Sequence, residues 1–299
     1  MRLLITGAWQ NAKEHLEAIH GMGHETVFLQ QEKDELPCDP EWVEGVICNN
    51  LFRHHKIEEF TNLRYIQLNS AGIDSMPLAY IREHGITLRN APGVYSIPIS
   101  EYVVGGVLQL YKQFPFFRNS QKQHAWIKHR GLLELSGKTV CIIGCGGIGQ
   151  ECAKRFQAFG CRTLGIATTE LQQPFFDEVK TGEALDAILP QADVVVLTLP
   201  LTEQSYHLIN KSRLAQMKPG GILVNVSRGG IVDTQALIEA LKTGHLSGAV
   251  LDVFEEEPLG ADSPLWDMEN VIITPHNSFS GDGIAERLKD VIFKGLANQ

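Results

Sequence analysis

Short apolar runs alternate with amphipathic stretches along the first third of the chain. Strands are predicted where the apolar runs lie, at residues 2–6, 25–29, 45–48, 65–68 and 87–89. Helices are predicted between them, near residues 11–20, 55–61 and 75–84. Because strands that alternate with helices pair in parallel, this region predicts a parallel α/β sheet.

A second alternating series begins at Lys138 and is more regular than the first. Its apolar runs predict strands at residues 139–143, 162–167, 194–197, 221–225, 248–253 and 271–274, and six strands suit a complete dinucleotide-binding sheet. Between the two series, residues 91–93 interrupt the pattern, and a long apolar helix is predicted at 98–118. A last amphipathic helix, from 283 to about 297, has no strand of its own and must pack on a domain already built.

The composition is that of an ordinary globular protein, with 299 residues, 43% hydrophobic and 20% charged, which is long enough for about two domains. The net charge of −9 argues against nucleic acid and against a membrane surface as partners, because a protein surface that binds either of them carries clustered Lys and Arg. The longest weakly charged apolar stretch, residues 102–111, is about half the length of a membrane-spanning helix. The chain begins with a strand-like run and not with a basic leader, so we expect a cytoplasmic protein.

Four of the six cysteines fall close together and raise the alternative of a metal site; they are Cys141, Cys145, Cys152 and Cys161. Their spacing contains no CxxC pair. We therefore expect small buried thiols in a reducing compartment, and no metal.

A glycine-rich loop follows the predicted strand at 139–143, with the spacing Gly144-x-Gly146-x-x-Gly149. A helical pattern starts directly after Gly149, as a dinucleotide-binding loop requires. Gly144 allows a tight turn, Gly146 lets the backbone approach a pyrophosphate, and Gly149 lets helix and strand pack closely. Gly147 lies in the same loop. The free N–H groups of the helix N-terminus are expected to bind the phosphates.

The residues after the next predicted strand decide which dinucleotide binds. An Asp or Glu there accepts from the ribose 2′-OH of NAD, whereas Ala167 is followed here by Thr168 and Thr169. The missing carboxylate removes one obstacle to NADP, but no Arg follows to bind its phosphate, and Glu170 is in reach of a ribose. We assign both threonines to the cofactor site and expect NADP or NAD, with NADP slightly favoured.

Three polar residues stand at the ends of successive predicted strands: Arg228, Glu257 and His276. The carboxyl ends of strands in a doubly wound sheet line one crevice, so these residues are expected to converge. Arg offers a planar fork of donors for a carboxylate and its neighbouring carbonyl. His can give the carbonyl oxygen a proton, and a carboxylate on its other nitrogen favours the charged ring. Each residue alone has a structural interpretation; only the set predicts reduction of a 2-oxo acid.

With these motifs, the chain resembles the D-2-hydroxyacid dehydrogenase family over nearly its whole length. GxGxxG, VNVSRGGIVD around Arg228, DVFEEEPL around Glu257 and TPHNS around His276 occur in the family's order. The resemblance implies hydride transfer between NAD(P)H and a small 2-oxo acid, such as glyoxylate, hydroxypyruvate or a phosphoglycerate-like substrate, to give a D-2-hydroxy acid. It implies that Arg228 binds substrate, that His276 is the acid/base and that Glu257 is its partner. The formate dehydrogenase branch carries Gln where Glu257 stands, so the Glu favours 2-oxo acid reduction.

The resemblance also assigns residues that bind the cofactor and the substrate. It implies that Asp252 holds the nicotinamide carboxamide. Further residues lining the cofactor are Ile148, Leu199, Pro200, Val226 and Ser227. The implied substrate loop contains Ser70, Ala71 and Gly72, and the amides of Ala71 and Gly72 would bind the carboxylate. Candidates for the pocket that receives the rest of the substrate are Tyr95, Phe52 and Arg53.

The predicted fold class is α/β, with two doubly wound parallel-sheet domains. A Rossmann cofactor domain, residues 97–279, is expected to be inserted into a flavodoxin-like substrate domain made of 1–96 and 280–299. The family builds a dimer on the helix predicted at 98–118, so we expect a homodimer. The family usually continues past the last helix, so the closing edge of the first domain is expected to be missing or ordered differently here. The alternative function is that of a cofactor-sensing corepressor-like protein, since the resemblance extends to such proteins.

Overall fold

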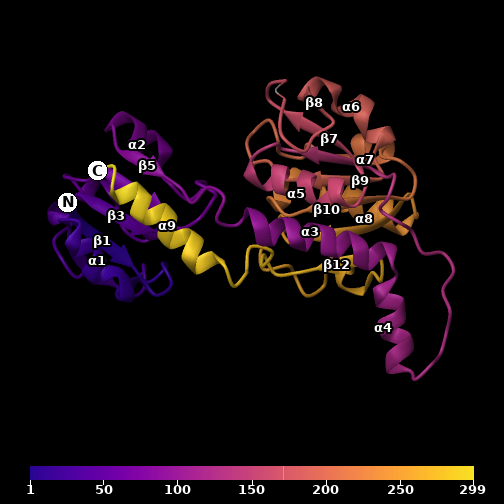
Figure 1. Cartoon of the computed structure of the whole chain (residues 1–299), viewed down its shortest axis with the longest axis horizontal. Coiled ribbons are helices and arrows are strands. Elements are labelled where there is room, and N and C mark those ends of the chain that lie inside the picture. The colour runs from indigo at the N-terminus through magenta and orange to yellow at the C-terminus, as the bar shows by residue number, and fades with distance from the viewer. Residues whose placement is uncertain (171) are drawn as a thin grey trace. The chain divides into compact units, whose positions relative to one another are not determined.

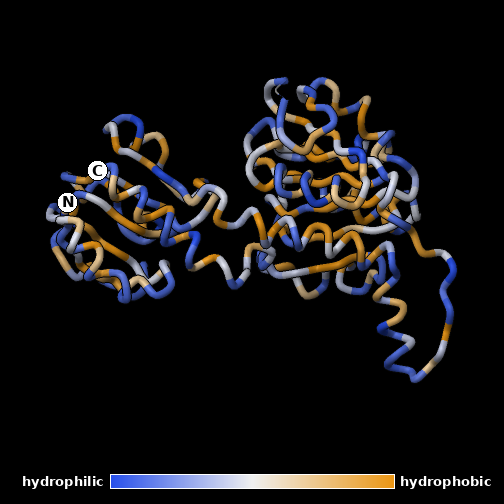
Figure 2. Tube along the Cα trace, in the orientation of Figure 1, coloured by the Kyte–Doolittle hydropathy of each residue, from blue (hydrophilic) through white to orange (hydrophobic). Residues whose placement is uncertain are grey.

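The chain divides into two compact units. The computed structural model describes residues 1–170 and 172–299 (Figure 1), and these form unit 1, Met1–Tyr95 with Gly281–Gln299, and unit 2, Ser96–Ser280. In each unit the apolar positions gather in the strands, as the colours of Figure 2 show. Each unit therefore has a hydrophobic core of its own.

Unit 1 is built on a parallel sheet. Within the described part of this unit, five strands pair in the order β2-β1-β3-β4-β5. The strands are β1 (Arg2–Thr6), β2 (Glu25–Leu29), β3 (Gly45–Cys48), β4 (Tyr65–Leu68) and β5 (Thr87–Arg89). β3 and β4 are buried along their whole length, and their residues are apolar except for Gln67 of β4. The predicted strands and their parallel pairing are confirmed.

Helices cover both faces of this sheet. On one face, Ile292 of the C-terminal helix joins a buried cluster with Leu3 and Tyr65. In Figure 1 this helix, α9, lies across the strands of unit 1. On the other face, Ile81 packs against β3 and β4. The helices are α1 (Leu16–Gly21), α2 (Leu78–Glu83) and α9 (Ile284–Leu296). The end of the chain thus completes the unit that its beginning starts.

The helix predicted at 55–61 is wrong. The segment contains a 3₁₀ turn, Ile57–Glu59, after which Phe60 leaves the helical region with ψ 65°. The ring of Phe60 packs edge-on against Phe52, with centroids 5.5 Å apart, so the chain turns to bury an aromatic pair. Other 3₁₀ turns of unit 1 are Ala12–His15, Pro40–Trp42 and Leu51–Arg53.

Unit 2 is built on a larger parallel sheet. Within its described residues, seven strands pair in the order β12-β11-β10-β9-β6-β7-β8. They are β6 (Thr139–Ile143), β7 (Arg162–Ala167), β8 (Glu178–Thr181), β9 (Val194–Leu197), β10 (Gly221–Asn225), β11 (Leu246–Leu251) and β12 (Val271–Ile273). Six were predicted, with β11 placed two residues late and β12 one residue too long. The strand missed, β8, is a short edge strand that no apolar run marks, since its residues are partly exposed.

Helices also cover both faces of the second sheet. α3 lies directly on β11, because a Cβ at Gly106 would come 2.6 Å from Val250. The other face carries the cluster of Leu185, Leu214 and Leu237. The helices are α3 (Ser96–Tyr111), α4 (Phe114–Lys122), α5 (Gly147–Ala158), α6 (Leu185–Ile188), α7 (Lys211–Gln216) and α8 (Thr234–Lys242). Further 3₁₀ turns are Gly182–Ala184, Leu189–Gln191, Gly229–Ile231 and Pro264–Asp267.

The single helix predicted at 98–118 is wrong, because the chain breaks between α3 and α4. Gln113 adopts the left-handed conformation, φ 54°, and Pro115 stands in the first turn of α4. Pro has no N–H to continue a helix but suits the start of one. α4 and the segment after it extend away from the sheet of unit 2 (Figure 1). Among the described residues, no helix combines the length and apolarity that a membrane span requires.

Candidate active site

The glycine loop makes the close contacts that its spacing predicts. Gly144 has φ 104°, a conformation that favours glycine, and a Cβ there would lie 2.7 Å from the backbone of Thr198. A Cβ at Gly149 would lie 2.1 Å from the carbonyl oxygen of Gly144, whereas one at Gly146 would meet open space. α5 begins at Gly147, so Gly149 lies inside the helix and not before it as predicted.

The first turn of α5 offers free donors. Its N-cap, Gly146, has no side chain to cap the helix, and the first helical hydrogen bond runs from Gln150 N to Gly146 O at 2.9 Å. Within the described chain, the N–H groups of Gly147, Ile148 and Gly149 make no hydrogen bond. Free N–H groups beside an open glycine fit the pyrophosphate of a dinucleotide.

The segment after β7 is tied to this loop. Thr168 and Thr169 are exposed, and the side chain of Gln150 donates to Cys145 O at 3.2 Å and to Gln173 Oε1 at 3.0 Å. Burial raises the pKa of the Cys145 thiol to about 11, so this side chain is neutral at the phosphate loop. The cysteines are free, and no cluster of His, Cys, Asp and Glu in the described residues could hold a metal ion.

His276 and Glu257 are in contact at the carboxyl ends of β12 and β11. Nδ1 of His276 lies 2.8 Å from Oε2 of Glu257, and both side chains are partly exposed. Oε1 of Glu257 accepts a hydrogen bond from the N–H of Phe254 at 3.0 Å. Nε2 of His276 makes no hydrogen bond within the part of the chain that the structure describes. The pair can therefore present Nε2 to a reacting oxygen while the carboxylate holds the ring.

Asp252 organises the turn that carries His276. Its side chain is buried, and its oxygens accept from the N–H groups of Asn277 at 2.7 Å and Ser278 at 3.0 Å, and from the hydroxyl of Thr274. The Asp252 carbonyl accepts from His276 N at 2.8 Å. His276 itself is left-handed, with φ 51°. The role of Asp252 in holding the turn that carries His276 was not predicted, although an Asp directly after a buried strand is a sequence feature that indicates it.

Arg228 follows β10 and lies next to residues 254–257, the turn that carries Glu257 (the Glu257 turn). Its guanidinium donates to Ser227 O at 2.7 Å, and its carbonyl accepts from the side chain of Asn225 at 3.0 Å. Gly229 touches the Glu257 turn so closely that a Cβ there would lie 1.8 Å from the carbonyl carbon of Phe254. The structure thus brings the segments that carry Arg228, Glu257 and His276 together in one unit.

The other cofactor candidates of unit 2 follow β9 and β10. Val226 and Ser227 are buried, and the Ser227 hydroxyl donates to the Leu199 carbonyl. Pro200 follows Leu199, and its carbonyl accepts from Ser205 at 2.8 Å. These bonds hold the strand ends beside each other at the carboxyl edge of the sheet.

The predicted substrate loop follows β4 in unit 1. The Ser70 hydroxyl donates to Gly72 O at 2.8 Å, and Asn90 donates to Ala71 O at 2.6 Å. The N–H groups of Ala71 and Gly72 make no hydrogen bond to any described residue. The loop therefore presents two neighbouring donors, which suits an anionic group.

The three candidates for the substrate side-chain pocket differ in their surroundings. Phe52 is partly buried and packs against Phe60 at the core of unit 1. Arg53 is exposed. The Tyr95 hydroxyl donates to the carbonyl of Asn69, beside the substrate loop.

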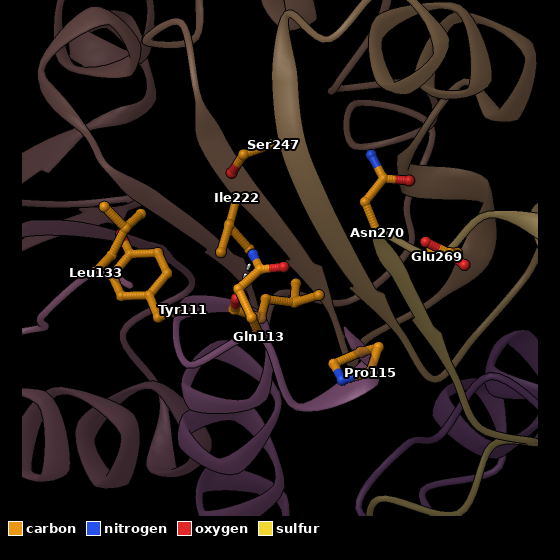
Figure 3. A pocket seen from close by; sticks show the side chains of 9 residues that line it. Tyr111, Gln113, Pro115, Leu133, Ile222, Ser247, Glu269 and Asn270 are labelled. Carbon is orange, nitrogen blue, oxygen red and sulfur yellow. Dashed lines mark hydrogen bonds between the residues drawn. The ribbon is translucent and has the colours of Figure 1, made fainter. Parts of the chain in front are cut away.

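A cavity of about 220 Å³ lies elsewhere in unit 2 (Figure 3). Its lining includes Ile222 and Ser247, near the amino ends of β10 and β11, together with Tyr111 and Gln113. Substrates of doubly wound sheets bind at the carboxyl ends of strands. The cavity contains none of the predicted site residues, so it is separate from the predicted active site.

Comparisons with known proteins show which family this chain is similar to. The model of the family "D-isomer specific 2-hydroxyacid dehydrogenase, NAD binding domain" matches residues 104–278. A D-3-phosphoglycerate dehydrogenase of Methanocaldococcus jannaschii is 36% identical over 257 residues, which are 81% of this chain but only 48% of that protein. A glyoxylate reductase of Thermofilum pendens is 34% identical, over 79% of this chain and 71% of the reductase. The crystal structure of a D-isomer specific 2-hydroxyacid dehydrogenase family protein from Aeromonas salmonicida superposes with a TM-score of 0.87 at 35% identity, covering 98% of this chain and 93% of that one.

Proposed function

Since this chain belongs to the D-isomer specific 2-hydroxyacid dehydrogenase family, we propose that it reduces a small 2-oxo acid to the D-2-hydroxy acid with Arg228, Glu257 and His276. NAD(P)-dependent hydride transfer between 2-oxo and 2-hydroxy acids is the activity of this family. The observation that carries the assignment of residues is the 2.8 Å contact between His276 Nδ1 and Glu257 Oε2, beside the Arg228 segment. Glyoxylate, hydroxypyruvate and a phosphoglycerate-like acid are the substrates we propose.

Unit 2 is the cofactor domain in this proposal, and unit 1 is the substrate domain. Bound NAD(P)H supplies the hydride. The free N–H groups at Gly147–Gly149 would bind its pyrophosphate, and Thr168 and Thr169 would contact its adenosine ribose. Because no carboxylate stands directly at the end of β7, NADP is slightly favoured over NAD. Leu199, Pro200, Val226 and Ser227 line the cofactor in this proposal.

The residues of the chain divide the remaining work of the reaction. In unit 2 the guanidinium of Arg228 binds the substrate carboxylate and polarises the carbonyl, and in unit 1 the amides of Ala71 and Gly72 are our proposed donors to an anionic group. His276 Nε2 gives a proton to the carbonyl oxygen, which becomes the hydroxyl of the product. Glu257 stabilises the charged ring that gives this proton. Asp252 contacts the nicotinamide carboxamide in this proposal and also holds the His276 turn.

We expect the chain to act as a cytoplasmic homodimer. α4 and the segment after it carry exposed apolar side chains, including Phe114, Ile127 and Trp126, the last 96% exposed. Apolar side chains that gather on one projecting segment are typical of a protein contact. Light scattering at micromolar concentration tests this expectation, and a monomer would overturn it.

The test of the proposed function compares His276→Gln with the wild-type chain on a panel of 2-oxo acids with NADH and NADPH. We expect His276→Gln to lose about a thousandfold in kcat, since it removes the proton donor, while binding of the reduced cofactor stays unchanged. His20→Gln, on an exposed part of unit 1, is the control and should reduce the acids normally. Undiminished turnover by His276→Gln would overturn the mechanism. Cofactor binding without turnover of any acid by the wild type would favour the corepressor-like alternative.

A further inference from the structure

A second histidine–carboxylate pair lies next to the one that the mechanism uses. Nε2 of His207 is 2.6 Å from Oε1 of Glu255, and the other oxygen of Glu255 accepts from Thr234 N at 2.9 Å. The side chains of His207 and Glu255 are 33% and 31% exposed, so water screens the pair only in part. The ring of Tyr206 stacks on His207, with centroids 4.1 Å apart.

This pair joins the ends of three strands. His207 lies in the segment after β9, Thr234 opens α8 after β10, and Glu255 lies in the turn after β11. The backbone N–H of His207 also donates to Gly230 O at 2.8 Å, in the segment that carries Arg228. His207 is left-handed, with φ 46°, a conformation that is uncommon for histidine and is held here by its surroundings.

Glu255 belongs to the same turn as Glu257. The N–H of Phe254 donates to Oε1 of Glu257, so the carboxylate that contacts His276 is held by the backbone beside Glu255. The turn contains three successive carboxylates, Glu255, Glu256 and Glu257, whose like charges repel one another. His207 and Thr234 supply hydrogen-bond partners for both oxygens of Glu255.

The charge state of Glu255 agrees with this arrangement. Burial raises the pKa of its carboxyl, but the hydrogen bonds from Thr234 and His207 outweigh burial and lower the pKa below its ordinary value. Glu255 is therefore ionised at neutral pH and can hold both donors.

We propose that His207 and Glu255 are positioning residues that keep Glu257 in contact with Nδ1 of His276 during turnover. The inference rests on the proposed function of His276 and Glu257. It predicts that removing either member lets the turn 254–257 move, so that Glu257 supports the charged ring less well. Binding of the cofactor, whose phosphates meet a different loop, should be affected little.

The experiment measures kcat, KM for the reduced cofactor, melting temperature and the pH profile of kcat for Glu255→Ala and His207→Ala. We expect kcat to fall about tenfold because Glu257 and His276 are then misaligned. The KM for the cofactor should stay within about twofold of wild type. The limb on which activity falls toward high pH should move to lower pH by about half a unit or more, because a less well placed carboxylate favours the charged ring less.

Two further variants separate positioning from general stability. The side chain of Glu256 is exposed and makes no hydrogen bond to any described residue. Glu256→Ala therefore removes the same charge from the same turn without breaking a contact, and it should keep the wild-type kcat and pH profile. His207→Gln keeps a donor near the position of Nε2 and should recover kcat to within about threefold of wild type.

Wild-type kcat and profile in both alanine variants would overturn the proposal. A lower melting temperature with an unmoved pH profile would also overturn it, since the pair would then be only structural. If Glu255→Ala does not fold, Glu255→Gln and His207→Ala decide by the same readouts. Running His276→Gln in parallel separates the two proposals: an active His276→Gln defeats the proposed function, whereas an inactive one beside a normal Glu255→Ala defeats only this inference.

Discussion

Replacing Gly229 by Ala should disable the enzyme through the position of the Glu257 turn. A Cβ at Gly229 would lie 1.8 Å from the carbonyl carbon of Phe254 and 2.3 Å from Glu255 N. Real Cβ atoms essentially never come within 3.0 Å of another atom, so the two segments must separate by about 1.2 Å. The atoms that the added Cβ would meet are backbone atoms, so no side chain can rotate to relieve the contact.

The same turn holds Glu257 at 2.8 Å from His276, so a separation of this size breaks that contact or bends it. A misplacement of about 1 Å in a catalytic arrangement can reduce the rate about a hundredfold. Overpacking of this kind costs about 1–3 kcal/mol in the free energy of unfolding. We therefore expect Gly229→Ala to fold with a lower melting temperature and to lose about a hundredfold in kcat.

The neighbouring glycine provides the control. A Cβ at Gly230 would meet its nearest atom, Cδ2 of Leu201, at 3.4 Å, which is ordinary contact. Steady-state kinetics with the best acid of the panel, together with thermal unfolding of both variants, make the comparison. The reasoning is refuted if Gly229→Ala and Gly230→Ala turn over at similar rates.

Three other outcomes follow from contacts of the same unit. Gly149→Ala, whose Cβ would lie 2.1 Å from Gly144 O, should weaken binding of the reduced cofactor at least about tenfold in a fluorescence titration; unchanged affinity would contradict the role of the loop. Asp252→Asn places an NH₂ group among backbone donors in a buried site and should lower the free energy of unfolding by about 1–3 kcal/mol, measured by denaturant titration, with loss of turnover through the His276 turn. The lowered pKa of Glu255 stabilises the native state above the ordinary value for glutamate, and this contribution is lost as the pH falls through the lower native value. Glu255→Gln should thus be less stable than wild type at neutral pH, with the difference shrinking in acid; a difference independent of pH would contradict this.

Most of the fold was predictable because the central strands of both sheets are buried on both faces. Buried parallel strands such as β3, β6 and β9 are apolar along most of their length, and this pattern marks them in the sequence. β8 lacked this mark because it is a partly exposed edge strand. The break between α3 and α4 was missed because apolar residues resume at Phe114, directly after Gln113. The backbone of Gln113 is left-handed, and a hydrophobic pattern gives no sign of such a conformation.

The candidate site divides in a similar way. The sequence by itself determined which residues stand at strand ends, and the rule that carboxyl ends of parallel strands share one edge placed Arg228, Glu257 and His276 near each other. What only the tertiary structure decided is which partner each side chain takes. Asp252 bonds a turn about 25 residues away, and His207 reaches Glu255 over 48 residues. Local patterns carry no information about such pairs, because a hydrogen bond depends on the register of neighbouring strands and on turn geometry to within a few tenths of an ångström.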